Sequence, residues 1–132
     1  MDIFPTFLTA AGVDLNQYEL DGKNILPMVI EGEKSSHDGL FWEMNEQTAV
    51  RKDKWKLVLN GHLVEDVPSE DNVHLSDLEN DMAESINLKE KYPQITKELK
   101  KIAQDWRNGI ENRWENEWLP KANGTTGYVK KK

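Results

Sequence analysis

The middle of the chain alternates apolar and polar residues in the pattern of short β-strands. Segments with this pattern are GLFWEMN at 39–45, TAVRKD at 48–53, KWKLVL at 54–59, HLVE at 62–65 and VHLSDL at 73–78. The pair Asn60-Gly61 is a strong signal for a β-hairpin between the third and fourth segments. Successive hairpins predict an antiparallel meander, and such a sheet can leave one face in water.

A helical period replaces the alternation at both ends of the chain. Near the start, the apolar residues at one face are Ile3, Phe4, Phe7, Leu8 and Ala11. Asp2 is suited to cap this short helix and Gly12 to stop it. Residues 13–32 read as irregular structure with one helical turn. The spacing therefore predicts a short, strongly apolar N-terminal helix.

A second, longer helix is predicted after Pro93, which is tolerated in a first turn. Its apolar stripe is Ile95, Leu99, Ile102, Ala103, Trp106, Ile110 and Trp114. Asn87 and Glu90 have the spacing of a capping box, and Trp118, Leu119 and Pro120 are expected to end the helix. The stripe must cover something, and the apolar face of the sheet is the obvious partner. The expected fold class is α+β.

Length, charge and cysteine content exclude several kinds of protein. The 132 residues suffice for one domain with one core, and the net charge of −7 disfavours nucleic acid and anionic membrane surfaces. No apolar run approaches the roughly 20 residues of a membrane span. The chain has no cysteine, which excludes disulfides, thiolate metal sites and cysteine nucleophiles.

The residues alone reveal no catalytic site. The three histidines, at positions 37, 62 and 74, lack metal-ligand spacing and read as surface or sheet-face residues. Residues 77–88 resemble a calcium loop but lack its glycine and its final glutamate. Trp114 and Trp118 could stack on a sugar, although a helix stripe docking on a core is the commoner role. Arg51 could bind a sulfate or carboxylate, although the pattern alone favours an ordinary charged strand edge.

Four blocks in order resemble the C-terminal portion of the sulfatase family, the formylglycine-dependent members of the alkaline-phosphatase-like superfamily. These blocks are DIFPTFLTAAGV, LDGKNILPMV, LFWE followed by AVRKDKWKLV, and VHLSDLENDMAESINLKEKYPQITKELKKIAQDW. The resemblance runs from Asp2 to about Trp118. It implies that residues 1–36 end the catalytic domain, residues 37–120 form the small C-terminal subdomain, and residues 121–132 are a flexible tail. In that subdomain an antiparallel sheet of about four strands packs against the long helix.

The resemblance also implies that the catalytic half of the enzyme lies elsewhere. Members of the family make formylglycine from Cys or Ser in a Cys/Ser-x-Pro-x-Arg motif. They hold calcium mainly through Asp and Asn residues of the N-terminal domain, including an adjacent Asp-Asp pair. This sequence has no cysteine, no serine two places before a proline, and no Asp-Asp pair. We therefore expect no catalytic residue, metal or cofactor in this chain, and a parent enzyme that uses calcium and formylglycine. The expected partners are that N-terminal catalytic domain and a sulfated small molecule or glycan.

Side chains of this subdomain often border the substrate pocket in the family, through the loop after LFWE. The candidates here are Glu43, Asn45 and Arg51. Met44 departs from the His or Gly that commonly follows the Glu, which puts a substrate role for this loop in doubt.

Two other readings stay open. The chain could be a stand-alone carbohydrate-binding or protein-interaction module, or part of a related phosphodiesterase or phosphonate hydrolase. Without a catalytic domain, the apolar first helix and one sheet face should be exposed and promote self-association. We expect Met1 to be a cloning start, because the first helix begins inside a family motif. The compartment stays open, although many bacterial members of the family are exported.

Overall fold

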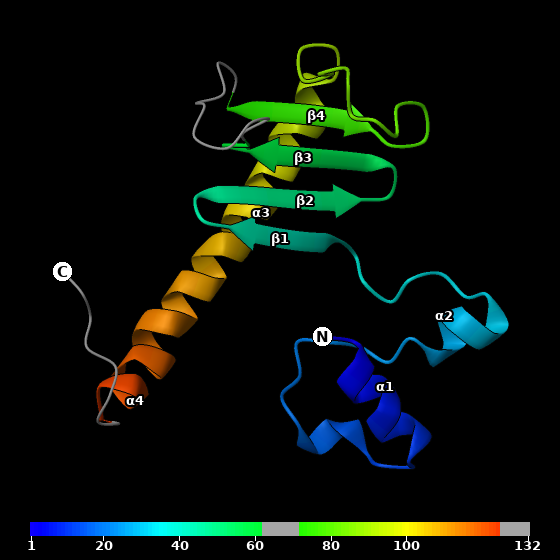
Figure 1. Ribbon diagram of the computed structural model, residues 1–132, viewed down its shortest axis with the longest axis vertical. Coiled ribbons are helices and arrows are strands. Elements are labelled where there is room, and N and C mark those ends of the chain that lie inside the picture. The colour runs from blue at the N-terminus through cyan, green and yellow to red at the C-terminus, as the bar shows by residue number, and fades with distance from the viewer. Residues whose placement is uncertain (62–71, 125–132) are drawn as a thin grey trace. The chain divides into compact units, whose positions relative to one another are not determined.

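The computed structural model describes residues 1–61 and 72–124, and it divides the chain into two compact units, Met1–Gly39 and Leu40–Lys132. Figure 1 shows helices in the first unit and a sheet with a long helix in the second. The predicted strand at 62–65, His62 and most of the predicted tail at 121–132 lie outside the described residues. Each unit is described by itself below.

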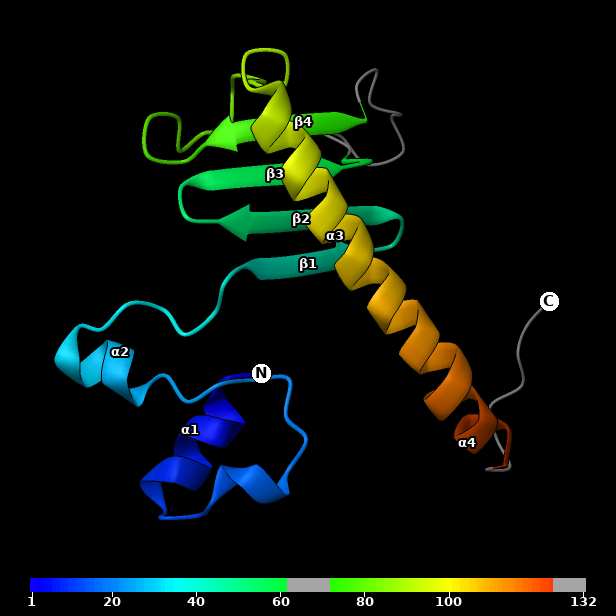
Figure 2. The ribbon, with the colours of Figure 1, turned by 180° about the vertical axis from the view of Figure 1, so that it is seen from behind.

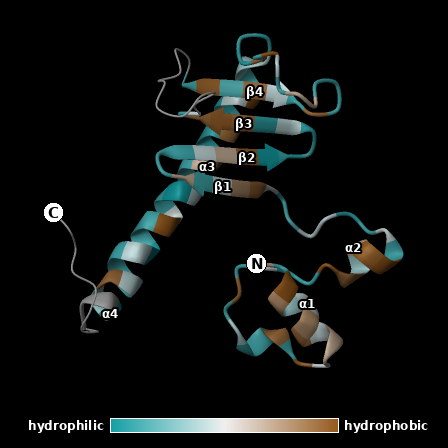
Figure 3. Ribbon diagram, viewed as in Figure 1, coloured by the Kyte–Doolittle hydropathy of each residue, from teal (hydrophilic) through white to brown (hydrophobic). Residues whose placement is uncertain are grey.

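The first unit consists of helix α1 (Ile3–Ala10), a short 3-10 turn (Leu15–Gln17) and helix α2 (Leu26–Glu31). Among the residues of these three helical elements, Pro5 alone is fully buried, and most apolar residues of α1 are exposed. Figure 3 shows how much of α1 and α2 is hydrophobic. Gly12 ends α1 with a φ of 76°, a backbone conformation that favours glycine. The predicted stop at Gly12 is therefore confirmed.

The prediction that the Asp2 side chain caps α1 is wrong. Asp2 occupies the N-cap position of α1 but makes no side-chain bond to the helix. Its carboxylate instead accepts hydrogen bonds from the Lys23 backbone N–H at 2.9 Å and from His37 Nε2 at 2.9 Å. These bonds join both ends of the first unit, and the Lys23 N–H lowers the pKa of Asp2. The Asp2 carboxylate does not cap the helix because its bonds to Lys23 and His37 occupy it.

The second unit contains a four-stranded antiparallel sheet in the order β1-β2-β3-β4. The strands are β1 (Leu40–Met44), β2 (Gln47–Lys52), β3 (Trp55–Leu59) and β4 (Val73–Asp77). Two-residue turns join the first three strands, and each begins with a left-handed residue: Asn45 at φ 55° and Asp53 at φ 54°. Asn and Asp tolerate this conformation better than most residues, which makes them suitable for tight hairpins.

The register assigns every strand residue to one of two faces. The rows Phe41–Val50–Leu57–Leu75 and Glu43–Thr48–Leu59–Val73 share one face. The rows Leu40–Arg51–Lys56–Ser76 and Trp42–Ala49–Val58–His74 share the other. His74 thus lies on a sheet face, as the sequence predicted.

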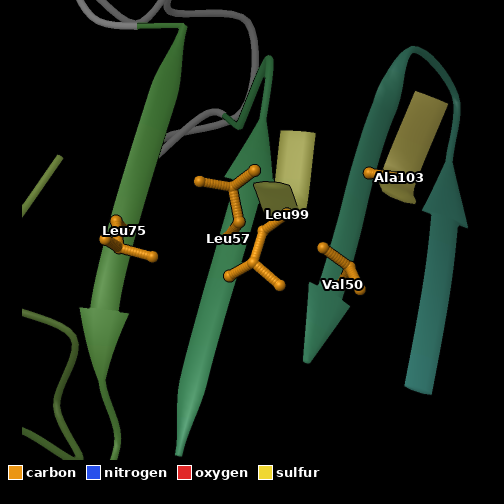
Figure 4. Packing of buried hydrophobic residues seen from close by; sticks show 5 residues of the cluster. All are labelled: Val50, Leu57, Leu75, Leu99 and Ala103. Atoms are coloured by element: carbon orange, nitrogen blue, oxygen red, sulfur yellow. The ribbon is translucent and has the colours of Figure 1, made fainter. Parts of the chain in front are cut away.

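The long helix α3 (Pro93–Arg113) covers the first of these faces (Figure 2). Its residues Leu99 and Ala103 pack with one apolar residue from each of strands β2, β3 and β4, and all five side chains are almost fully buried. Figure 4 shows this cluster, which comprises Val50, Leu57, Leu75, Leu99 and Ala103. The prediction that the apolar stripe covers the sheet is confirmed for this part of the helix. The chain therefore has the predicted α+β fold.

Two predictions about the far end of the helix are wrong. The helical run continues through a π-helical turn (Trp114–Trp118) into α4 (Leu119–Gly124), past the predicted end. The Leu119 N–H donates to the Trp114 carbonyl, five residues back, and Pro120, which has no N–H, follows directly after Leu119, the C-cap residue of this π-helical turn. Trp114 and Trp118 are 52% and 51% exposed, so they do not dock on the core.

The predicted capping box at Asn87 is also wrong, because the Asn87 side chain bonds the backbone of β4. Its Oδ1 accepts from the Leu75 N–H at 3.1 Å, and its Nδ2 donates to the Val73 carbonyl at 2.9 Å. The Leu88 N–H adds a bond to the Leu75 carbonyl. Residues 87–88 therefore occupy the outer edge of β4, while α3 begins five residues later with Pro93 at its first position.

Candidate functional site

A hollow of about 550 Å³ lies where the β1–β2 turn and the end of β3 meet the middle of α3. We call it the turn–helix pocket. The sheet contributes Glu46, Thr48, Leu59 and Asn60 to its walls. The helix contributes Ala103, Gln104, Asp105, Arg107, Asn108 and Glu111. Most of these side chains are polar, so the pocket suits a ligand rich in hydrogen-bonding groups.

Arg107 carries the positive charge of this wall, and two carboxylates engage it. One guanidinium nitrogen lies 3.0 Å from Glu43 Oε1, and another lies 2.8 Å from Glu111 Oε1. Arg107 Nε also donates to Glu111 at 3.0 Å. Because Glu46 and Asp105 add further negative charge, the pocket as a whole repels an isolated sulfate. Its amide and carboxylate groups are suited to the hydroxyls of a sugar.

The three candidate residues are placed differently around this pocket. Glu43 lies on the helix-covered face and reaches Arg107. Asn45 lies next to Glu46 in the β1–β2 turn, and the Asn60 side chain ties that turn to the end of β3 by donating to the Glu46 carbonyl at 3.2 Å. Arg51 lies on the opposite face of the sheet, where its Nε donates to the Asp53 carbonyl at 3.2 Å. The fold thus brings Glu43 and Asn45 to one region and Arg51 to another.

The sequence pattern did not predict the residues that α3 contributes to the pocket. Arg107 and Glu111 are four residues apart on a helix, which is a recognisable signal for an ion pair. The contact between Arg107 and Glu43 has no such signal, because it depends on where α3 crosses β1.

Another electrostatic contact of the sheet lies away from the pocket. Lys54 Nζ lies 2.9 Å from Asp77 Oδ2, and the same carboxylate accepts from Asn80 Nδ2 at 2.9 Å. These bonds hold the pKa of Asp77 below its usual range, and the hydrogen bond to Asp77 raises the pKa of Lys54. The bond from the Ile86 N–H likewise lowers the pKa of Asp81 in the following loop. These contacts hold the loop after β4 in place, which is a structural role.

No cluster of three or more His, Cys, Asp or Glu side chains in residues 1–61 and 72–124 is arranged to hold a metal ion. Within the same ranges, none of the helices is both long and apolar enough to cross a membrane.

Comparison with known proteins gives a structural match and no sequence match. No family model and no curated protein matches the chain. A solved structure from work on glycosaminoglycan metabolism by Bacteroides thetaiotaomicron, designated a 6S-sulf protein, superposes with a TM-score of 0.64 at 19% identity over 81% of this chain. BT4656, solved in complex with its substrate D-glucosamine-2-N,6-O-disulfate, superposes with a TM-score of 0.61 at 21% identity over 89% of this chain.

The chain has the fold of the C-terminal portion of bacterial sulfatases. It spans 24% and 25% of the two solved chains, about a quarter of their length. The resemblance stated from the sequence blocks is therefore confirmed at the level of the fold.

Proposed function

We propose that this chain is the C-terminal subdomain of a formylglycine-dependent sulfatase that acts on a sulfated carbohydrate. The observation that supports this most is the superposition over 81% and 89% of the chain on two sulfatase structures. The order of the four sequence blocks is independent support. In this proposal residues 1–36 complete the catalytic domain, residues 37–120 form the subdomain, and the parent enzyme supplies formylglycine and calcium.

The chemistry of the chain supports a non-catalytic role for it in that enzyme. Sulfate ester hydrolysis requires a nucleophile and a group that polarises the sulfate oxygens. The sequence contains no cysteine and no Ser-x-Pro that could become formylglycine. We therefore expect no hydrolysis of aryl or sugar sulfates by this chain alone, and activity when the catalytic portion is present on the same polypeptide.

The β1–β2 turn is the element that we assign to the substrate pocket. Glu43 pairs with Arg107, which lines the turn–helix pocket, and Asn45 directly precedes the lining residue Glu46. The polar groups of this pocket suit sugar hydroxyls better than a sulfate. The sulfate itself would be held by the catalytic portion. The substrate of BT4656 carries both sugar hydroxyls and sulfate groups, which is consistent with separate binding of the two by the subdomain and the catalytic portion.

Because Glu43 and Arg51 lie on opposite faces of the sheet, they cannot both border one small substrate through the same face. This gives a direct test in the enzyme that includes the catalytic portion. Glu43→Gln and Asn45→Ala should raise KM by about tenfold with little effect on kcat, as expected when uniform binding is lost. Arg51→Ala serves as the comparison. An effect confined to Arg51→Ala would assign the substrate to the other face and overturn the role of the turn.

One observation favours the second candidate function, a stand-alone carbohydrate-binding or protein-interaction module. Trp114 and Trp118 are half exposed on the same helical run, and Lys121 Nζ lies 5.3 Å from the Trp118 ring centre. Exposed tryptophans stack on sugar rings. Titration of the isolated chain with glucosamine sulfates, followed by tryptophan fluorescence, tests this role. A change in emission that Trp114→Ala abolishes would support it, and an unchanged spectrum would contradict it.

A further inference from the structure

The two edges of the sheet are treated differently. On β4, the outward-facing Leu75 N–H, Leu75 carbonyl and Val73 carbonyl are all bonded by residues 87–88. At the other edge, β1 has no strand beyond it within the described part of the chain. Exposed strand edges usually carry lysine, proline or a bulge that blocks further pairing. The sequence LFWEM of β1 has no lysine, proline or bulge, and its one charged residue, Glu43, is paired with Arg107 on the helix-covered face.

The alternating hydrogen-bond pattern of the sheet shows which backbone groups of β1 point away from β2. The Asn60 N–H bonds the Asn72 carbonyl and the Leu78 N–H bonds the Lys54 carbonyl, so even-numbered residues of β3 bond β4. Because bonding direction alternates along a strand, odd-numbered residues of β3 bond even-numbered residues of β2. Odd-numbered residues of β2 then bond β1, and their partners are Leu40, Trp42 and Met44. The backbone groups of Phe41 and Glu43 therefore point toward the open edge.

Apolar side chains surround this edge on both faces. On the uncovered face, Trp42 is 48% exposed and Met44 is 65% exposed. On the covered face, the helical run continues past β1 (Figure 2) and exposes Ile110, Trp114 and Trp118. The distance along the helix from Trp106 to Trp118 is about 18 Å at 1.5 Å per residue, which is more than three strand spacings. The helical run thus continues beyond the β1 edge of the sheet.

We propose that two copies of this chain associate through β1, in antiparallel register about a two-fold axis at Trp42, to form a continuous eight-stranded sheet. Phe41 then pairs with the partner's Glu43, and Glu43 with the partner's Phe41, so the outward backbone groups form four hydrogen bonds. On the uncovered face Trp42 meets the partner's Trp42, and Leu40 meets the partner's Met44. This inference goes beyond the proposed function and does not rest on it.

A second copy fits this edge because β1 is complementary to itself in this register. Its single charged residue, Glu43, is already paired with Arg107 and faces an aromatic ring of the partner. Like charges therefore do not oppose each other across the new strand pair. The net charge of −7 on each copy opposes association at long range, and salt screens that repulsion. Association should consequently strengthen as the salt concentration rises.

Sedimentation velocity of the 132-residue chain over a range of concentrations is the first test. We expect a monomer–dimer equilibrium that shifts toward dimer between 20 mM and roughly 500 mM NaCl, concentrations at which the Debye length falls several-fold. A chain that stays monomeric throughout would contradict the proposal and leave the edge to a strand of another polypeptide. Larger species without a discrete dimer would contradict it as well.

Single cysteines test the register, since the chain has none of its own. In the proposed dimer the Cα atoms of residue 42 and its counterpart are about 4.5 Å apart, within disulfide range. Those of residue 40 are about 13 Å apart, because four residue steps separate them along the strand. Oxidised Trp42→Cys should therefore migrate as a covalent dimer, and the matched control Leu40→Cys should stay monomeric under denaturing conditions.

The outcomes distinguish the proposed register from other modes of contact. Equal cross-linking of both variants, or of Leu40→Cys alone, would overturn the antiparallel pairing about Trp42. Far-UV circular dichroism establishes that each variant folds, and the sedimentation test of the unsubstituted chain does not depend on either of them. A failed dimer leaves the sulfatase proposal intact, because that proposal is tested by activity and by gene sequence.

Discussion

Trp106 joins the long helix to the edge of the sheet. Its ring stacks on Phe41 with 5.0 Å between centroids and an interplanar angle of 12°. Trp118 belongs to the same helical run but is half exposed. Two identical residue types thus occupy different environments, which gives a matched pair for measuring what the contact with the sheet contributes.

Trp106→Ala should lower the free energy of unfolding by about 2–4 kcal/mol, since it removes a stacked ring and leaves a gap beside Phe41. Trp118→Ala should change it by less than about 0.5 kcal/mol. Urea denaturation followed by circular dichroism measures both. Equal effects of the two substitutions would mean that the stack contributes nothing beyond ordinary helix stability.

Asp77 makes the stability of the second unit sensitive to acid. Contact with Lys54 and Asn80 lowers its pKa in the folded state. A carboxyl whose pKa is depressed by folding stabilises the protein above its unfolded pKa of about 3.9, and this contribution is lost as the pH falls through the folded value.

Asp77→Asn should therefore lower the melting temperature at pH 7 and narrow its difference from the unsubstituted chain as the pH approaches 2. The exposed Glu90→Gln is the control and should leave the pH profile unchanged. Thermal melts at intervals between pH 2 and pH 7 provide the measurement. A constant difference between Asp77→Asn and the unsubstituted chain at every pH would show that the carboxylate charge is not responsible.

Asn87 illustrates how one side chain protects an entire strand. Its amide completes the backbone hydrogen bonds at the outer edge of β4, next to the buried Leu75. Asn87→Ala should cost about 1–3 kcal/mol, because it leaves a partly buried N–H and a carbonyl without their bonds. It should also increase aggregation, since it uncovers a second strand edge. Chemical denaturation and light scattering measure these two effects.

The control for that substitution is Gln94→Ala, which removes an exposed amide from α3. If both substitutions had the same small effect, the edge of β4 would be protected by the backbone of Leu88 alone.

The sequence predicted the strands well because alternation and turn chemistry are local. The strands at 40–44, 47–52, 55–59 and 73–77 all fall within or close to predicted segments, and Asn45 and Asp53 occupy the turns. The end of the helix was missed because Pro120 is accommodated by a π-helical turn, which has no simple sequence signal.

The errors at Asn87 and Asp2 share one physical cause. Both residues have the chemistry of a helix cap, but each finds partners far away in the sequence. A side chain that can satisfy either a nearby helix end or a distant backbone group is not assigned by spacing alone. For the same reason the Glu43–Arg107 contact in the candidate site could not be predicted, although Glu43 itself was a candidate.

The molecule as a whole consists of two units with very different cores. The second unit buries five apolar side chains in one cluster, whereas the helices of the first bury Pro5 alone and expose apolar residues. A chain of residues 40–124 should therefore fold by itself and melt cooperatively, and residues 1–39 alone should not. Circular dichroism and amide NMR dispersion of the two pieces test this. An unfolded 40–124 chain would show that the second unit depends on the first.

The central claim is that this chain completes a sulfatase whose catalytic portion lies upstream. The most direct measurement is the sequence that precedes Asp2 in the source gene. The proposal predicts an open reading frame that continues upstream and contains Cys-x-Pro-x-Arg or Ser-x-Pro-x-Arg a few hundred residues before Asp2. A stop codon directly before Met1, or an upstream frame without this motif, would contradict it.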